Sequence, residues 1–174
     1  MVLNMPSLFN LFPSSSTIGD GIGANVEQTV ISKISGKGEG CIFVPLVVPT
    51  TVTAGTWEMT LQTSSVFNTT FISTATINEE CAFIAYLDAG TYSMDFIYRK
   101  TTGAGILTLK LDATTVLTLD MYAGASSYNN ISTTTGIVIV DGGFKAITLL
   151  MASKNVLATD YGFYGAGIVF RRTA

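Results

Sequence analysis

The sequence predicts an all-β protein: a jelly-roll β-sandwich of about nine to ten strands with an extended N-terminal arm. From about Cys41 onward, short runs of β-favouring residues are separated by Gly, Asn, Asp and Ser. The runs recur about every ten residues, as expected for the strands of two packed sheets. No stretch shows a sustained apolar period of about 3.6 residues with helix caps, so helices are not expected.

Residues 1–40 form the predicted arm, and residues 41–174 form the predicted sandwich domain. The arm alternates apolar clusters with prolines and glycines, which excludes a long helix. A free arm of this kind would expose its apolar side chains, so we expect it to dock on a neighbouring subunit or another protein. The alternative is that it covers one end of its own domain. The residues expected to bind the partner are Leu3, Leu8, Phe9, Leu11 and Phe12.

Each β-favouring run defines an expected strand, the first of which, Val26–Ile34, lies within the arm. The expected strands of the domain are Cys41–Val48, Thr56–Thr63, Val66–Thr74, Glu80–Tyr86, Gly90–Arg99, Gly105–Asp112, Thr115–Tyr122, Ile137–Val140, Phe144–Ala152 and Tyr164–Arg171. Alternation is clearest where Leu107, Leu109 and Leu111 share one face, so that face should line the core.

Two further patterns predict burial. Ile137–Val140 is apolar on both faces, which favours a strand covered on one side by the second sheet and on the other by a partner. The segment Ala54–Leu61 recurs as Ala89–Phe96, each time with an aromatic residue, Met, and Leu or Phe at alternate positions. This repeat predicts two equivalent core strands. Their inward residues are expected to be Trp57, Met59 and Leu61 in one copy and Tyr92, Met94 and Phe96 in the other.

Composition excludes several classes of function. The 174 residues include nine Lys or Arg, twelve Asp or Glu and no His, for a net charge of −3. Without a basic surplus, nucleic-acid binding is disfavoured, and catalysis or metal binding by His is excluded. Pro or polar residues interrupt every apolar run, so we predict no transmembrane helix and no membrane partner. The uncharged N-terminus also lacks the pattern of a signal peptide.

The sparse charge predicts contacts with other subunits. A compact monomer of this mass would expose roughly 8,000 Å², or about 390 Å² for each charged side chain. Charged residues make up 12% of this chain, whereas the surface of a freestanding soluble domain usually carries about twice that fraction. Because the mean hydropathy is also positive, at +0.46, we expect part of the surface to be buried between subunits.

The candidates for chemistry are few. Cys41 and Cys81 lie in separate apolar runs and are expected as buried free thiols rather than as a disulfide. Most aspartates lie at expected strand ends, where Asp favours turns, so we predict no catalytic residue and no cofactor. Calcium bound at Asp112 and Asp120, or at Asp141, is a less favoured alternative because no cluster of alternate acidic residues is present.

Two aromatic segments are candidates for a glycan site or a protein interface. Sugar sites on β-sandwiches pair exposed aromatic rings with amide and carboxylate groups, but Tyr is also favoured at protein contacts, and we favour the interface. The segment from Tyr122 to Asn130 is expected to be a loop, and a second cluster runs from Tyr161 to Tyr164. The candidate residues are Tyr122, Tyr128, Asn129, Asn130 and Tyr161.

From Ala82 to its end, about half of the chain resembles a known group of domains. The matching segments are Ala89–Tyr92, Gly105–Asp112, Thr118–Tyr122, Gly136–Ile137, Met151–Asn155 and Arg171–Ala174. Together they resemble the jelly-roll domains, similar in layout to carbohydrate-binding modules, that are found in tail, fibre and other virion proteins of tailed bacteriophages. The resemblance implies a non-enzymatic virion component, commonly trimeric, and it brings no catalytic residue.

We therefore expect a bacteriophage structural protein, located in virions that assemble in the host cytoplasm. The favoured role is a homotrimeric head decoration or cement protein, held by its arm to the major capsid protein or another virion protein. A small body and an arm suited to lacing across capsid subunits favour this role. The alternative is a tail-fibre or receptor-binding tip protein that binds a glycan on the host surface.

Overall fold

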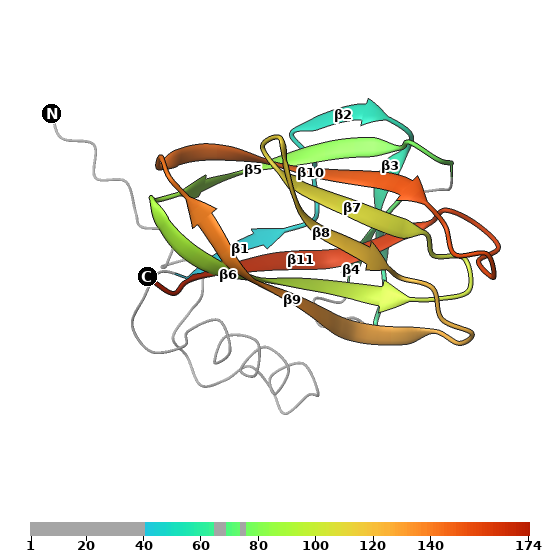
Figure 1. Cartoon of the computed structure of the whole chain (residues 1–174). Helices are drawn as coiled ribbons and strands as arrows, with labels where there is room; N and C mark the ends of the chain where they lie inside the picture. Colours follow the sequence, from blue (N-terminus) through green and yellow to red (C-terminus); the bar gives the residue numbers. More distant parts are fainter. Residues whose placement is uncertain (1–40, 65–68, 74–75) are drawn as a thin grey trace, which may run out of the picture.

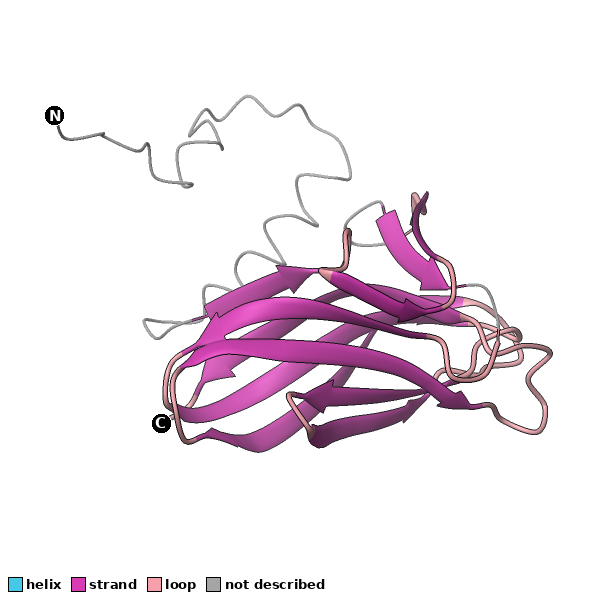
Figure 2. Ribbon diagram, turned by 90° about the horizontal axis from the view of Figure 1, so that it is seen from above, coloured by secondary structure: helices cyan, strands magenta, loops and turns pink. Residues whose placement is uncertain are grey.

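The computed structural model describes residues 41–64, 69–73 and 76–174, which form eleven β-strands in two packed sheets (Figures 1 and 2). The prediction of an all-β jelly-roll sandwich is confirmed. No helix within these ranges is long and apolar enough to cross a membrane. The predicted arm, with its expected strand Val26–Ile34, lies outside the described residues.

Sheet A contains, in spatial order, β3 (Trp57–Leu61), β4 (Thr69–Ser73), β11 (Phe163–Arg172), β6 (Gly90–Lys100) and β9 (Ser127–Ile139), and β1 (Cys41–Pro45) also pairs with β11. Sheet B contains β2 (Thr51–Ala54), β5 (Glu80–Leu87), β10 (Gly143–Ser153), β7 (Ile106–Leu111) and β8 (Thr114–Asp120) in that order. All of these strand pairs are antiparallel. The edge strands β8 and β9 line a common cleft on one side of the sandwich.

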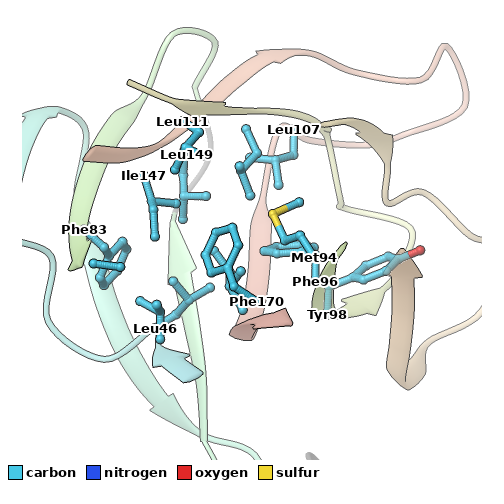
Figure 3. Close-up of a cluster of buried hydrophobic side chains, with 14 of the residues drawn as sticks. Leu46, Phe83, Met94, Phe96, Tyr98, Leu107, Leu111, Ile147, Leu149 and Phe170 are labelled. Carbon is cyan, nitrogen blue, oxygen red and sulfur yellow. The ribbon is translucent and has the colours of Figure 1, made fainter. Parts of the chain in front are cut away.

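The core lies between the sheets and takes alternate side chains from each inner strand (Figure 3). Leu107, Leu109 and Leu111 of β7 are buried, as their alternation predicts. The largest fully buried side chains are Tyr92, Phe96, Phe163, Phe170, Leu46, Leu87, Met94, Leu107, Leu109, Met121 and Ile147. Burying each such side chain stabilises the fold by about 1.5–3 kcal/mol, so the strand ends that carry the loops rest on a rigid scaffold.

The two ends of the sandwich differ in the length of their connections (Figure 1). Short turns join β5 to β6, β7 to β8 and β9 to β10 at the end where the chain terminates. Longer segments join β6 to β7, β8 to β9 and β10 to β11 at the opposite end, which we call the loop end: residues 101–105, 121–126 and 154–162. Long loops on a rigid scaffold are where binding sites concentrate.

Strand β9 begins earlier than predicted, and strand β2 was not predicted at all. The segment expected to be a loop as far as Asn130 becomes strand β9 at Ser127. Its Ser, Thr and Asn residues pair with the buried strand β6, and a partly exposed edge strand needs no apolar alternation. The short strand β2 was not expected, because all four of its residues are exposed and give no periodic signal.

The repeat predicts burial correctly in one copy only. Tyr92, Met94 and Phe96 of β6 are buried, as expected. In β3, by contrast, Met59 and Leu61 are exposed, because this strand lies at the edge of sheet A. Trp57 alone of the three expected core residues of β3 packs against the core, with its ring centre 5.4 Å from that of Phe163.

Strand β9 ends with one apolar face in the core and one outside it. Ile137 and Ile139 are buried, whereas Val138 and Val140 are 65% and 79% exposed. The first face confirms the expected cover by the second sheet. Cover of the other face by a partner stays a prediction.

Both cysteines are free thiols, as predicted. Cys81 is buried in the core, whereas Cys41 is only half-buried, on the outer face of sheet A. Burial raises the pKa of both thiols, and the positive charge of Arg171 opposes part of the rise at Cys41. Neither thiol is therefore activated as a nucleophile at neutral pH.

Candidate functional site

Backbone hydrogen bonds tie the three segments of the loop end together. The Gly162 N–H donates to the Gly103 carbonyl, and the Gly105 N–H donates to the Gly162 carbonyl, each at 2.9 Å. The Met121 N–H donates to the Gly105 carbonyl at 3.1 Å. A Cβ at position 162 would lie 2.9 Å from the Gly103 carbonyl oxygen, so glycine permits this close approach. The loop end is thus one preorganised surface.

A cationic and aromatic cluster on sheet A adjoins this surface. Arg99, near the end of β6, places its guanidinium carbon 4.9 Å from the ring centre of Tyr128 and 5.2 Å from that of Tyr164. A terminal nitrogen of Arg99 donates to the Ser126 hydroxyl at 2.9 Å, which donates in turn to the Thr101 hydroxyl at 3.2 Å. We call Arg99, Tyr128, Tyr164 and Ser126 the Arg99 cluster.

The Arg99 cluster contains one donor that no described residue pairs with. The Nε–H of Arg99 is buried and meets no acceptor among the described residues. A buried donor left without an acceptor costs about 1–3 kcal/mol. Because this atom has almost no exposed surface, an oxygen atom of a ligand would accept from it only after the Arg99 side chain shifts. The two half-buried tyrosine rings beside it offer apolar surface without such a shift.

Asn129 and Asn130 of β9 differ in what their side chains can do. The Asn130 amide donates to the Ser127 carbonyl at 2.8 Å and accepts from the Ser127 hydroxyl at 3.3 Å, so it stabilises the start of the strand. Asn129 is exposed, has a φ of 58° and donates to the Ser64 carbonyl at 3.3 Å. This left-handed conformation is uncommon outside glycine and is enriched at functional positions. Asn129 is therefore the better candidate for ligand contact.

Tyr122 and Tyr161 belong to the other two segments of the loop end. Asp120 joins these segments, because one carboxylate oxygen accepts from the Tyr122 N–H at 2.9 Å and the other from the Asn155 amide at 2.6 Å. The Lys154 ammonium lies 4.9 Å from the ring centre of Tyr161. Both tyrosines are half-buried. The loop end therefore combines fixed aromatic rings with cationic donors.

All five candidate residues of the predicted glycan or interface loop lie at or beside the loop end, although three of them belong to β9 rather than to a loop. The five apolar residues expected to bind a partner lie in the arm, outside the described residues: Leu3, Leu8, Phe9, Leu11 and Phe12. Binding by either set stays a prediction.

Other parts of the described chain offer less to a ligand. Residues 41–64, 69–73 and 76–174 contain no group of three or more His, Cys, Asp or Glu that could hold a metal ion. A cleft of about 440 Å³ between β8 and β9 contains Asp112, Asp141 and Lys145, but no aromatic residue lines it. Asp112 is already engaged, because its carboxylate accepts from the Ala146 N–H at 2.9 Å and pairs with Lys145 at 3.4 Å.

Arg99 was not among the predicted site residues. Its sequence signal is weak: Arg99 is the last residue of β6 that alternates outward from the core, next to a glycine-containing loop. Tyr86 and Phe144, whose side chains are exposed on the outer face of sheet B, were also not predicted as site residues.

Comparison with known proteins identifies the fold. No protein-family model and no curated protein sequence matches this chain. Among solved structures, a xanthan lyase from Paenibacillus aligns over 73% of this chain with 18% identity and a TM-score of 0.64. The CBM36-1 domain of a multidomain xylanase from the hindgut metagenome of Trinervitermes trinervoides aligns over 78% with 13% identity and a TM-score of 0.57. The GH26-CBM35 β-(1,4)-mannanase of Podospora anserina aligns over 79% with 11% identity and a TM-score of 0.56.

The share of each matched structure that this chain covers differs widely. The chain spans 12% of the xanthan lyase and 28% of the mannanase, but 98% of the CBM36-1 domain. The alignment thus covers nearly all of the CBM36-1 domain and only a part of each enzyme. At these identities the likeness establishes the fold, a jelly-roll β-sandwich of the carbohydrate-binding-module type.

Proposed function

We propose that this chain is a non-catalytic carbohydrate-binding domain that binds a glycan at its loop end. The Arg99 cluster carries the proposal: two half-buried tyrosine rings lie beside a guanidinium whose buried Nε–H has no acceptor among the described residues. The similarity of the whole domain to the CBM36-1 module supports it.

The chemistry of this surface suits a sugar. The C–H faces of a sugar ring pack on tyrosine rings, while its hydroxyl oxygens accept hydrogen bonds from Arg and Asn. The hydrogen-bonded loops keep these groups in place, which lowers the entropy cost of binding. Asp120 uses both carboxylate oxygens to join two loops, so it serves the structure of the site rather than glycoside hydrolysis.

The biological setting of this proposal is a bacteriophage virion. A domain of this kind in a tail fibre or receptor-binding tip would present its loop end to a glycan of the host surface. The sequence resemblance to jelly-roll domains of phage virion proteins supports this setting and implies a homotrimer.

Head decoration is the second candidate, favoured by the low fraction of charged residues, 12%, and by the apolar arm. Its test is deletion of residues 1–13, which should leave a folded domain that no longer attaches to virus particles. Normal attachment of the truncated protein would refute this role.

A glycan array probed with the full chain, followed by calorimetric titration of the best oligosaccharide, tests glycan binding. Tyr128→Ala and Arg99→Met should each weaken binding about tenfold, which corresponds to about 1.4 kcal/mol of lost contact. Val138→Ala is the control, because Val138 is exposed on β9 near the opposite end. If the full chain gives no signal on the array, or if all variants bind equally, the proposal is wrong.

A further inference from the structure

The outer face of sheet B is apolar along its two adjacent strands β5 and β10. Burial alternates along both strands, and the residues between the buried ones point away from the core. We call six of these outward residues the apolar face: Ala82, Ile84, Tyr86, Phe144, Ala146 and Leu150. The two remaining outward positions between Glu80 and Leu150 are Glu80 itself and Thr148.

The two aromatic residues of the apolar face contact each other and remain exposed to solvent. Phe144 lies opposite Tyr86 in the β10 to β5 register, and Ala146 lies opposite Ile84. The two rings meet edge to face, with their centres 5.4 Å apart and an interplanar angle of 83°. Phe144 remains 77% exposed, Tyr86 53% and Ile84 50%. An antiparallel sheet with one face in water normally has polar residues there, so these side chains mark a contact surface.

The charge and size of this surface fit a second copy of the same chain. Glu80 is the one residue charged at neutral pH among the nine outward positions of β5 and β10, and Lys110 of the adjacent strand β7 faces outward opposite Thr148. Two such faces can therefore meet with little like-charge repulsion. Five strands of up to about eight paired residues give sheet B a projected area of roughly 650 Å². A stable interface buries about 800 Å² of accessible surface on each partner, which a face of this projected size can supply.

We propose that the apolar faces of two copies pack on each other across a two-fold axis. A surface that meets an identical surface forms a closed dimer, with each aromatic pair packed against the other copy. Phe144 is the expected main contributor, because it is the most exposed aromatic residue of the face, at 77%, and aromatic residues supply much of the energy of protein contacts. This pairing lies outside the proposed glycan site, and a closed dimer would replace the homotrimer that the sequence resemblance implies.

Sedimentation velocity of the full chain over a range of micromolar concentrations tests the pairing. The wild-type protein should sediment as a dimer, and Phe144→Lys should weaken its self-association at least about tenfold. Val156→Lys is the matched control, because Val156 is 94% exposed on the loop end and should leave the dimer intact. Ile84→Lys provides a second change on the same face, and a thermal melt of each variant verifies folding.

The outcomes separate clearly. Loss of the dimer in both folded variants of the apolar face, with retention in Val156→Lys, supports the proposal. A monomeric or trimeric wild-type protein, or a dimer that survives Phe144→Lys and Ile84→Lys, overturns it. Glycan binding by the wild-type monomer would at the same time leave the proposed function in place, so the two failures are distinguishable.

Discussion

Replacing Asp95 by Asn is expected to destabilise the domain by about 2 kcal/mol, because it breaks an ion pair that is mostly withdrawn from water. Asp95 of β6 and Arg171 of β11 pair on the outer face of sheet A, with side-chain exposures of 13% and 29%. The other carboxylate oxygen of Asp95 accepts a hydrogen bond from the Thr133 hydroxyl of β9 at 2.7 Å. One carboxylate therefore connects three adjacent strands.

The magnitude follows from this partial burial. Removing one partner of a fully buried ion pair costs about 3–5 kcal/mol, whereas a fully exposed pair is worth about 0–1 kcal/mol. Asn has the same shape as Asp and keeps one oxygen that can still accept a hydrogen bond from Thr133. The expected loss of stability therefore comes from the missing negative charge beside Arg171. For a domain of this size, about 2 kcal/mol lowers the melting temperature by roughly 4–8 °C.

Thermal and urea unfolding of the wild type and the Asp95→Asn variant measure this difference. The control is Asp112→Asn, which removes the charge from the more exposed pair with Lys145, where Asp112 is 51% exposed. That change should cost less than about 1 kcal/mol. If Asp95→Asn costs no more than the control, partial burial does not strengthen the Asp95 pair and the reasoning is wrong.

Three further outcomes are expected. Ellman's reagent should label Cys41 slowly in the folded protein and Cys81 only after unfolding, because Cys81 is fully buried and burial raises its pKa; rapid labelling of both thiols would contradict this. Gly165→Ala should cost about 1–3 kcal/mol in urea unfolding, since the added Cβ would lie 2.4 Å from the Phe163 ring, while Gly124→Ala, with no atom within 4 Å, should be neutral. Asp120→Ala should speed amide exchange in residues 121–126 and 154–162, and unchanged exchange there would refute its role in joining the loops.

The fold class could be predicted because the strands of a sandwich core carry a local signal. In β7, Leu107, Leu109 and Leu111 alternate with polar residues, and this period of two is visible without any partner strand. The same reasoning fails for β3, where Met59 and Leu61 have the same alternation but are exposed. Alternation shows which residues share a face, whereas the position of a strand in its sheet decides whether that face is covered.

The candidate site could be predicted only in part, for a related reason. Tyr128 and Asn129 are conspicuous in the sequence because aromatic and amide residues lie side by side. Their proximity to Arg99 depends on the register of β6 with β9, which shifts near this point between the pairs Tyr98 with Asn130 and Lys100 with Ser127. Such irregularities in register have no local sequence signal of their own, so sequence reasoning missed Arg99.

The two proposed surfaces become connected if both exist. Two linked sugar sites bind one glycan-coated surface more tightly than a single site does, because the second contact is made at high effective concentration. A dimer formed through the apolar face would carry two loop ends. Phe144→Lys should therefore leave the affinity for a free oligosaccharide unchanged, because the loop end is intact, and should weaken adsorption to a dense glycan surface.

Tyr128→Ala should instead weaken both measurements, because it alters each site itself. Comparing titration of the free sugar with adsorption to a coated sensor separates the two effects. Equal losses from Phe144→Lys in both assays would place Phe144 in the sugar site and remove the distinction between the surfaces. If Phe144→Lys weakens adsorption alone, the apolar face contributes to binding by bringing two weak sugar sites together in one dimer.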